Sequence, residues 1–147
     1  FKKCKSLSQK YKDVCLYKAA IEEAHTNANK SLSICSNIND RYISGRCSSD
    51  IIGIIINDDK SRIKESLIIC ENIRNAYWES ECYFNVAESV YTPYLEPRAF
   101  NKSKINLALD ICEKSKLFKN NCYIHVLWDL SFAKINDICR YSLSCIL

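Results

Sequence analysis

Apolar residues recur at fixed distances from the cysteines of this 147-residue chain. In "LIICENIRNAYWESECYFNVA", residues 67–87, an isoleucine precedes Cys70, a polar stretch follows, and apolar residues continue after Cys82. Positions one, four, five and eight after the second cysteine of four such pairs are mostly apolar: Leu16, Ala19, Ala20, Glu23; Ser48, Ile51, Ile52, Ile55; Tyr83, Val86, Ala87, Val90; Tyr123, Val126, Leu127, Leu130. These offsets trace one stripe along a helix and do not alternate as in a strand. A helix with one buried face is therefore predicted to begin just before each second cysteine.

The residues before each first cysteine predict another helix. Isoleucine directly precedes four of the five first cysteines, and leucine stands three positions before three of them: Ile34, Ile69, Ile111, Ile138; Leu32, Leu67, Leu109. The first cysteines are about 34 residues apart on average, as in helical-hairpin repeats. The predicted fold is all-α, a single domain over residues 1–147. It is an array of about four to five helical hairpins, similar to an α-solenoid.

The cysteine spacing within each unit predicts the disulfides. Where two helices meet at a turn, residues ten to twelve apart can reach the ~5.5 Å Cα separation of a disulfide. One local bond per hairpin is therefore predicted: Cys4–Cys15, Cys35–Cys47, Cys70–Cys82, Cys112–Cys122 and, with the shortest spacing, Cys139–Cys145.

Two segments need separate interpretation. Ile51–Ile56 is a β-branched run around Gly53 that by itself resembles a buried strand. The repeat places a helix there, so we predict a helix. The loop "YTPYLEPRAFNKSK", residues 91–104, contains both prolines and is the largest insertion, and insertions in repeat arrays often form the working face.

Composition supports helices and secretion. Gly and Pro occur only twice each, too few for a fold with many tight turns. Ten cysteines in a small chain indicate disulfides formed in an oxidising compartment. The chain has no CxxC pair for zinc and no CxxCH for haem, so no cofactor is predicted. It begins at Phe1 and contains no Met, so we expect that a signal peptide has been removed and that the protein is extracellular or at the cell surface.

Charge and hydropathy exclude two classes of partner. The net charge of +4 is too small to predict nucleic-acid binding, and no apolar run approaches the ~20 residues that a membrane span requires. Lysines are concentrated near the N-terminus, at Lys2, Lys3, Lys5, Lys10, Lys12 and Lys18. We interpret them as a solvated helix face, with contact to an acidic or phosphate-rich surface as the alternative.

Catalysis is not predicted. No ligand or nucleophile is positioned by spacing near His125, which is expected to be packed or at the surface, and His25 is expected to cap a helix or to be solvated. The pairs Glu22/Glu23 and Asp58/Asp59 are adjacent in helices, where side chains point about 100° apart, so they are interpreted as solvated faces.

Several residues are candidates for surface functions. Asn29 and Asn101 begin the sequons Asn-Lys-Ser, both between predicted helices, and are candidate glycosylation sites. Trp78 and Trp128 are expected in the core. Tyr94 and Phe100, in the long loop, are expected to contact a protein, because aromatic side chains give a large contact area with few rotatable bonds.

One family resemblance is carried by Cys70, Ile73, Cys82, Tyr83, Val86 and Ala87, in the patterns Cys-x-x-Ile…Cys and Cys-Tyr…Val-Ala. The chain resembles the cysteine-rich, disulfide-stapled helical-hairpin repeats of secreted microbial proteins, which are similar in architecture to Sel1-like and tetratricopeptide repeats. The resemblance implies an array of helix pairs. The Gly and Ala that Sel1-like repeats place at helix contacts are not abundant here, so no binding residues are transferred.

The leading hypothesis is a non-enzymatic, secreted or cell-surface protein that contacts copies of itself or other cell-surface proteins, as a subunit of an extracellular filament or sheath. The last unit, "INDICRYSLSCIL", is short and ends in the apolar residues Ile146 and Leu147, which we expect to make such contacts. The alternative is a helical carrier of a small apolar ligand. A secreted hydrolase or toxin is the third hypothesis.

Overall fold

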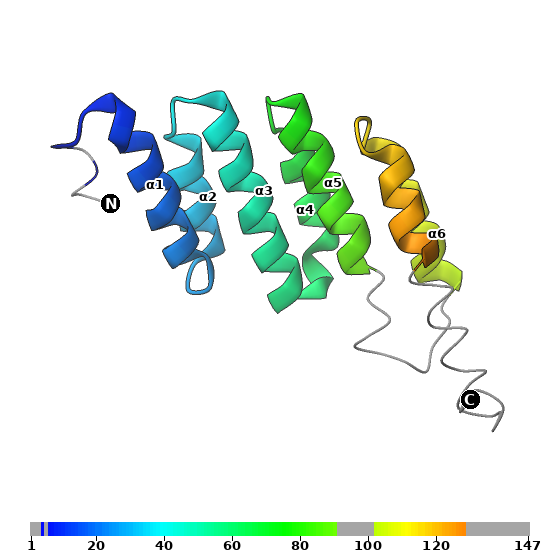
Figure 1. The fold of residues 1–147 in the computed structure, drawn as a ribbon. Coiled ribbons are helices and arrows are strands. Elements are labelled where there is room, and N and C mark those ends of the chain that lie inside the picture. The colour runs from blue at the N-terminus through cyan, green and yellow to red at the C-terminus, as the bar shows by residue number, and fades with distance from the viewer. Residues whose placement is uncertain (1–3, 5, 91–101, 129–147) are drawn as a thin grey trace, which may run out of the picture.

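A computed structural model describes residues 4, 6–90 and 102–128, and these residues form a line of helical hairpins (Figure 1). The helices are α1 (Gln9–Ala24), α2 (Ala28–Ser36), α3 (Arg41–Asp58), the short 3₁₀ helix η2 (Lys60–Arg62), α4 (Ile63–Glu71), α5 (Ala76–Val90) and α6 (Lys102–Lys114). Residues 119–128 are also helical. No strand occurs among these residues, and Ile51–Ile56 lies inside α3, which confirms the helix predicted there.

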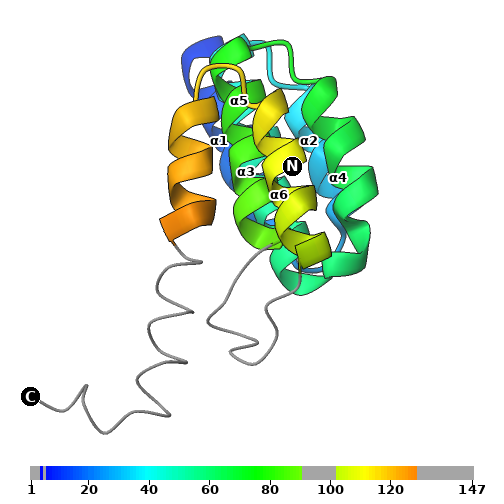
Figure 2. The same cartoon turned by 90° about the vertical axis from the view of Figure 1, so that its right-hand side faces the viewer.

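The helices are arranged in two layers (Figure 2). One layer contains α1, α3, α5 and helix 119–128, and the other contains α2, α4 and α6. Successive helices of the first layer pack on one another, α1 on α3 and α3 on α5. Within each hairpin the two helices also pack together, α2 on α3 and α4 on α5. The array of helical hairpins predicted from the sequence is therefore confirmed.

The core lies between the layers and contains the predicted stripe. Four and five residues after the second cysteine, Ile51, Ile52, Val86 and Ala87 are fully buried. Trp78 is also buried, as predicted. The prediction of a core position for Trp128 is wrong, because this side chain is 61% exposed at the last described turn of helix 119–128.

Four disulfides staple the hairpins at their turns. Cys4–Cys15, Cys35–Cys47, Cys70–Cys82 and Cys112–Cys122 are all formed, with Cα separations of 5.5 to 5.6 Å. These are the predicted pairs, and their sequence separations of 10 to 12 residues match a turn between two antiparallel helices. The predicted bond between Cys139 and Cys145 lies outside the described residues.

The turns after the first cysteines share one geometry. The third residue after the first cysteine is buried in three hairpins, and its N–H donates to the carbonyl of that cysteine at 3.1 Å: Ile38, Ile73 and Ser115. Asp40 then begins α3 and Asn75 begins α5, each by accepting two backbone N–H groups with its side chain. The same backbone path therefore leads into both helices.

Neighbouring hairpins interlock through the position two residues before the second cysteine. There, the Asp13 carboxylate accepts the N–H groups of Asn39 and Asp40, which belong to the next turn. Ser80 accepts the N–H of Leu117, also in the next turn, at 3.2 Å. These bonds tie the turn of one hairpin to the helix of the hairpin before it at two junctions, and at the junction between them the corresponding residue is Gly45.

Candidate protein-contact surface

Several titratable side chains in the described part of the chain are engaged in surface contacts. His25 follows α1 and lies 3.3 Å from Asp58, and both side chains are exposed. Lys30 binds Glu23 at 2.7 Å and holds the pKa of that carboxyl below its ordinary value. Asp59 accepts the N–H of Ser61 and so begins η2, and hydrogen bonding from Ser61 lowers the pKa of Asp59. These roles belong to helix ends and surface ion pairs.

No group of three or more His, Cys, Asp or Glu side chains in residues 4, 6–90 and 102–128 is arranged to hold a metal ion. The eight cysteines of this part are all in disulfides. They therefore supply no thiolate ligand or nucleophile.

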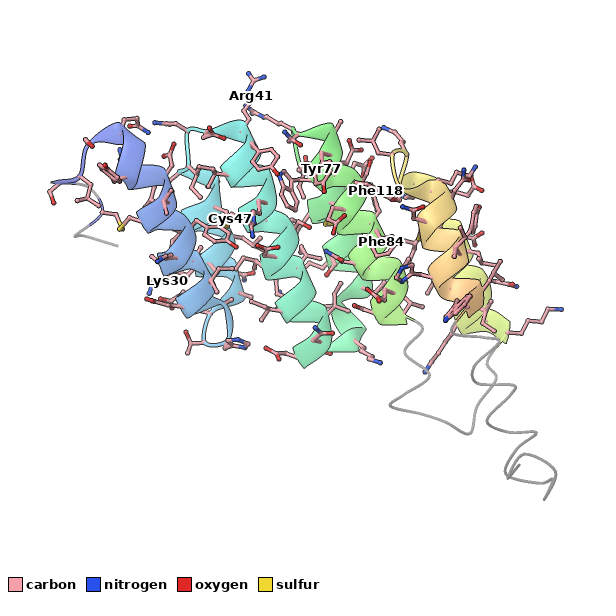
Figure 3. All side chains as sticks on the ribbon, in the orientation of Figure 1. Lys30, Arg41, Cys47, Tyr77, Phe84 and Phe118 are labelled. Atoms are coloured by element: carbon pink, nitrogen blue, oxygen red, sulfur yellow. A yellow bond between two sulfur atoms is a disulfide. The ribbon has the colours of Figure 1, made fainter. Side chains whose placement is uncertain are left out.

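An aromatic row crosses the outer side of the α1, α3 and α5 layer, and we define it as Tyr17, Tyr42, Tyr77, Trp78, Phe84 and Phe118. Tyr42 meets the edge of Trp78 at a centroid distance of 5.3 Å, and Tyr77 meets Phe118 at 5.1 Å. Figure 3 shows Tyr77 and Phe118 side by side, one from α5 and one from the turn before helix 119–128, with Phe84 farther along α5. Tyr42 and Tyr77 are both exposed, so the row presents aromatic edges to solvent.

One cation is already held in this row. The Arg46 guanidinium lies 5.6 Å from the ring centre of Tyr17 and 5.8 Å from that of Trp78, and it is 3.6 Å from the Asp50 carboxylate. The Tyr17 hydroxyl donates to the same carboxylate at 2.5 Å. Burial and this hydrogen bond raise the pKa of Tyr17. The arrangement combines cation–π contacts with an ion pair.

A groove of about 450 Å³ lies between α5 and helix 119–128, and we call it the α5 groove. Its lining residues are Glu81, Phe84, Phe118, Asn121, Ile124 and His125. Glu81 is partly buried and makes no hydrogen bond or ion pair with the described residues. Burial, and then the carboxylates of Asp50 and Glu88, raise the pKa of Glu81. His125 contacts the ring of Phe84 at 5.1 Å and lies 3.9 Å from Glu88.

A second groove, of about 650 Å³, lies in the other layer between α2 and α4. Its lining is mainly polar and includes Ser36, Asn39, Asn72, Arg41 and Arg74. Both arginines are exposed at its rim. The helices of this layer contact one another less than those of the α1, α3 and α5 layer, which leaves this space open.

The predicted surface residues fall mostly outside the described part. Tyr94, Phe100, Asn101, Ile146 and Leu147 all lie there. Asn29 is described and its side chain is exposed, but it lies in the first turn of α2, so the prediction that its sequon falls between helices is wrong. The sequon hydroxyl of Ser31 is buried and donates to the carbonyl of Ala20 at 2.6 Å.

Sequence analysis missed the aromatic row, although the repeat contains its signal. The fourth or fifth residue before each second cysteine is aromatic in all four described hairpins, and four members of the row stand at these positions: Tyr42, Tyr77, Trp78 and Phe118. The stripe that predicts a buried face lies after those cysteines, so it does not reveal the aromatic positions before them. Contacts between neighbouring hairpins also depend on how the hairpins stack, which the pattern within one hairpin does not give.

No family model matches the sequence, and comparisons with curated proteins and with solved structures found no match. The resemblance to Sel1-like and tetratricopeptide repeats therefore has no support from relatives, and the chain is a cysteine-rich, all-helical protein. Over residues 4, 6–90 and 102–128, no helix has both the length and the apolar character needed to cross a bilayer. The disulfides are consistent with an extracellular protein.

Proposed function

We propose that this chain is a non-enzymatic, secreted or cell-surface protein that contacts other copies of itself end to end, as a subunit of an extracellular filament or sheath. In this proposal the helical hairpins form a rigid rod, in the manner of Sel1-like and tetratricopeptide arrays. The contacts between copies are proposed to lie at the two ends of the described array. The long loop and the residues after helix 119–128, including Tyr94, Phe100, Ile146 and Leu147, are proposed to add to these contacts.

The observation that carries the proposal is the exposure of stacking positions at the two ends of the described array. Leu7 is the third residue after Cys4, and it is 43% exposed, whereas its counterparts Ile38, Ile73 and Ser115 are at most 8% exposed. Leu127 is the fifth residue after Cys122, and it is 52% exposed, whereas its counterparts Ala20, Ile52 and Ala87 are fully buried. Both ends therefore present leucine at positions that inner hairpins bury against a neighbour.

Repeat arrays need a polar cap at each end to remain separate in solution. When two complementary, uncapped ends belong to one chain, the contact between them is heterologous and generates a ring or an open filament. A clustered apolar surface that is exposed in this way typically marks a protein interface. The proposed contact would resemble the contact between inner hairpins, in which the counterparts of Leu7 and Leu127 are buried.

The test is the concentration dependence of the native protein's mass, measured by light scattering, together with electron microscopy. We expect growth into linear assemblies. Leu7→Asp and Leu127→Asp each place a charge in the proposed contact, and each should abolish that growth. Ile68→Asp is the matched control, because Ile68 is 62% exposed on α4 in the middle of the array, away from both ends.

A strict monomer at all concentrations, with no partner recovered from the cell surface, would contradict the proposal. Equal loss of assembly in Ile68→Asp would show that apolar exposure in general, and not the ends, causes association. Circular dichroism on each variant would verify that the helices are retained.

The carrier of a small apolar ligand remains the alternative. We favour protein contact because the α5 groove contains the partly buried carboxylate of Glu81, which an apolar ligand would leave without a partner. Extraction of the native protein followed by mass spectrometry would detect a bound lipid and would favour the carrier.

Glycosylation at Asn29 and Asn101 is part of the proposal for a secreted protein. The buried hydroxyl of Ser31 requires that sugar be attached to Asn29 before α2 packs on α1. Intact-mass analysis of the native protein before and after enzymatic removal of N-linked sugar would test both sites.

A further inference from the structure

We propose that the α5 groove binds an arginine side chain presented by a partner protein. The proposal deepens the proposed function, on which it rests for the protein nature of the partner, by naming the chemical group that one site recognises. Neither Leu7 nor Leu127 lines the groove, so the two proposals can fail independently.

The repeat itself provides the template for this site. Arg46 stands one residue before the second cysteine of its hairpin and lies over the ring of Tyr17, two residues after the second cysteine of the hairpin before. At the junction of the last two described hairpins the corresponding residues are Asn121, in helix 119–128, and Phe84, in α5. Both line the α5 groove. Asn121 has a short side chain, so the space next to Phe84 is open where the corresponding space next to Tyr17 holds a guanidinium.

The third member of the site also has a counterpart. Asp50 stands three residues after the second cysteine of its hairpin and accepts a hydrogen bond from the hydroxyl of Tyr17. The equivalent residue in the last described hairpin is His125, which contacts the ring of Phe84. In both junctions an aromatic ring of one hairpin therefore lies beside a polar side chain of the next. The difference between them lies in the charges placed around the ring.

Those charges are complementary to an external cation. The residue directly before the second cysteine is Val14 in the first hairpin and Arg46 in the second, and these two hairpins form the N-terminal junction. In the two hairpins that form the C-terminal junction, this residue is Glu81 and Asn121. The internal cation is lost and a carboxylate is gained. Glu81 is partly buried and has no ion pair among the described residues, and the nearby carboxylates of Asp50 and Glu88 increase the negative potential.

A guanidinium fits this combination better than an ammonium. It is planar, it stacks on aromatic rings, and it can pair with a carboxylate through two parallel hydrogen bonds. Phe84 and Phe118 provide aromatic surface, Ile124 provides an apolar wall for the methylene stem, and Glu81 provides the carboxylate. The groove volume of about 450 Å³ accommodates one such side chain.

The test is an NMR titration of the isotope-labelled, oxidised protein with N-acetylarginine amide. Its neutral isostere N-acetylcitrulline amide and N-acetyllysine amide serve as comparisons. We expect the arginine probe to shift the signals of Glu81, Phe84, Phe118 and Ile124. The affinity should be at least tenfold weaker for citrulline and several-fold weaker for lysine. Equal affinity for citrulline, or shifts confined to the groove between α2 and α4, would overturn the proposal.

Two variants test the same site from the protein side. Glu81→Gln should weaken binding of the arginine probe at least fivefold. Glu22→Gln is the control, because it removes an exposed carboxylate on α1, and it should leave binding of the probe unchanged. Asn121→Arg restores an internal arginine at the position of Arg46, and it should occupy the groove and abolish binding. Unchanged binding in Asn121→Arg, with its helical content retained, would contradict the proposal.

The lysine probe also defines an outcome. If lysine binds as tightly as arginine and Glu81→Gln weakens both, the groove recognises positive charge alone, and the assignment to arginine is wrong. The assembly of the protein is measured separately, so failure of the leucine variants to change assembly would refute end-to-end contact without affecting this result.

Discussion

At the scale of single residues, the two glycines of α3 have different roles. Gly45 lies where α3 passes the turn of the next hairpin, and a Cβ added there would lie 3.0 Å from Cβ of Trp78 and 3.2 Å from Cβ of Asn75. Gly53 lies in the same helix, and a Cβ there would meet nothing within 4 Å. The close approach of two hairpins therefore requires glycine at one position and not at the other.

The two glycines form a matched pair of substitutions. Gly53→Ala should raise the free energy of unfolding by about 0.5–1 kcal/mol, because alanine favours the helix. Gly45→Ala gains the same helix propensity but must displace Trp78, and we expect a net loss of about 1–2 kcal/mol. Denaturant unfolding under non-reducing conditions would measure both. Stabilisation by Gly45→Ala equal to that by Gly53→Ala would show that the hairpins do not approach as described.

Glu81 makes stability depend on pH with a defined sign. Burial and neighbouring carboxylates raise its pKa in the folded state above the unfolded value, so the folded state binds the proton more tightly. This contribution favours folding below the ordinary glutamate pKa and is lost as pH rises through the raised value. Glu81→Gln should therefore raise the melting temperature at pH 7 and leave it nearly unchanged at pH 3.5.

Glu113 provides the control of opposite sign. Hydrogen bonds from Lys119 and Tyr123 lower the pKa of its exposed carboxyl, so the ionised form supports the fold. Glu113→Gln should lower the melting temperature at pH 7, where Glu81→Gln raises it. Shifts of the same sign for both variants would contradict the assignment of charge environments.

At the scale of elements, the repeat was the decisive signal in the sequence. The segment Ile51–Ile56 has the composition of a strand, and only its place relative to Cys47 identified it as helix. Pairing within each hairpin followed from the spacing of cysteines across a turn, because two adjacent helix ends bring those Cα atoms together. Local geometry was therefore predictable from local pattern.

Features that depend on neighbouring elements were not predictable. Trp128 was expected in the core because large aromatic residues usually are, but whether a helix end is covered depends on the next hairpin. The sequence pattern predicts Asn29 in a loop, but the side chain of Asn27 accepts the N–H of Lys30 and so begins α2 before Asn29. The aromatic row and the α5 groove arise from contacts between hairpins, such as Tyr42 with Trp78 and Phe84 with His125.

Each disulfide is expected to stabilise mainly its own hairpin. Closing a loop of about twelve residues contributes roughly 3 kcal/mol in the chain-entropy model. Replacing Cys35 and Cys47 together by alanine should therefore lower the free energy of unfolding by about this amount. In a linear array each hairpin contacts only its neighbours, so amide hydrogen exchange should accelerate most in α2 and the start of α3. Uniform acceleration over all described helices would contradict local stapling.

At the scale of the whole molecule, the described array of helical hairpins has two sides and two ends that differ. One side presents the aromatic row and the α5 groove, and the other presents the more open layer of α2, α4 and α6. The two ends of the described array present Leu7 and Leu127, at positions where the inner hairpins have buried residues. This division supports separate roles, with contact between copies at the ends and recognition of a basic side chain on one side.

The account as a whole depends on disulfides that join neighbouring helices and never distant hairpins. Peptide mapping of the native protein by mass spectrometry, under non-reducing conditions, tests this most directly. We predict five bonds, the four described here and Cys139–Cys145, with no free thiol. A bond between cysteines of different hairpins, or a free thiol at any of the ten cysteines, would contradict the account.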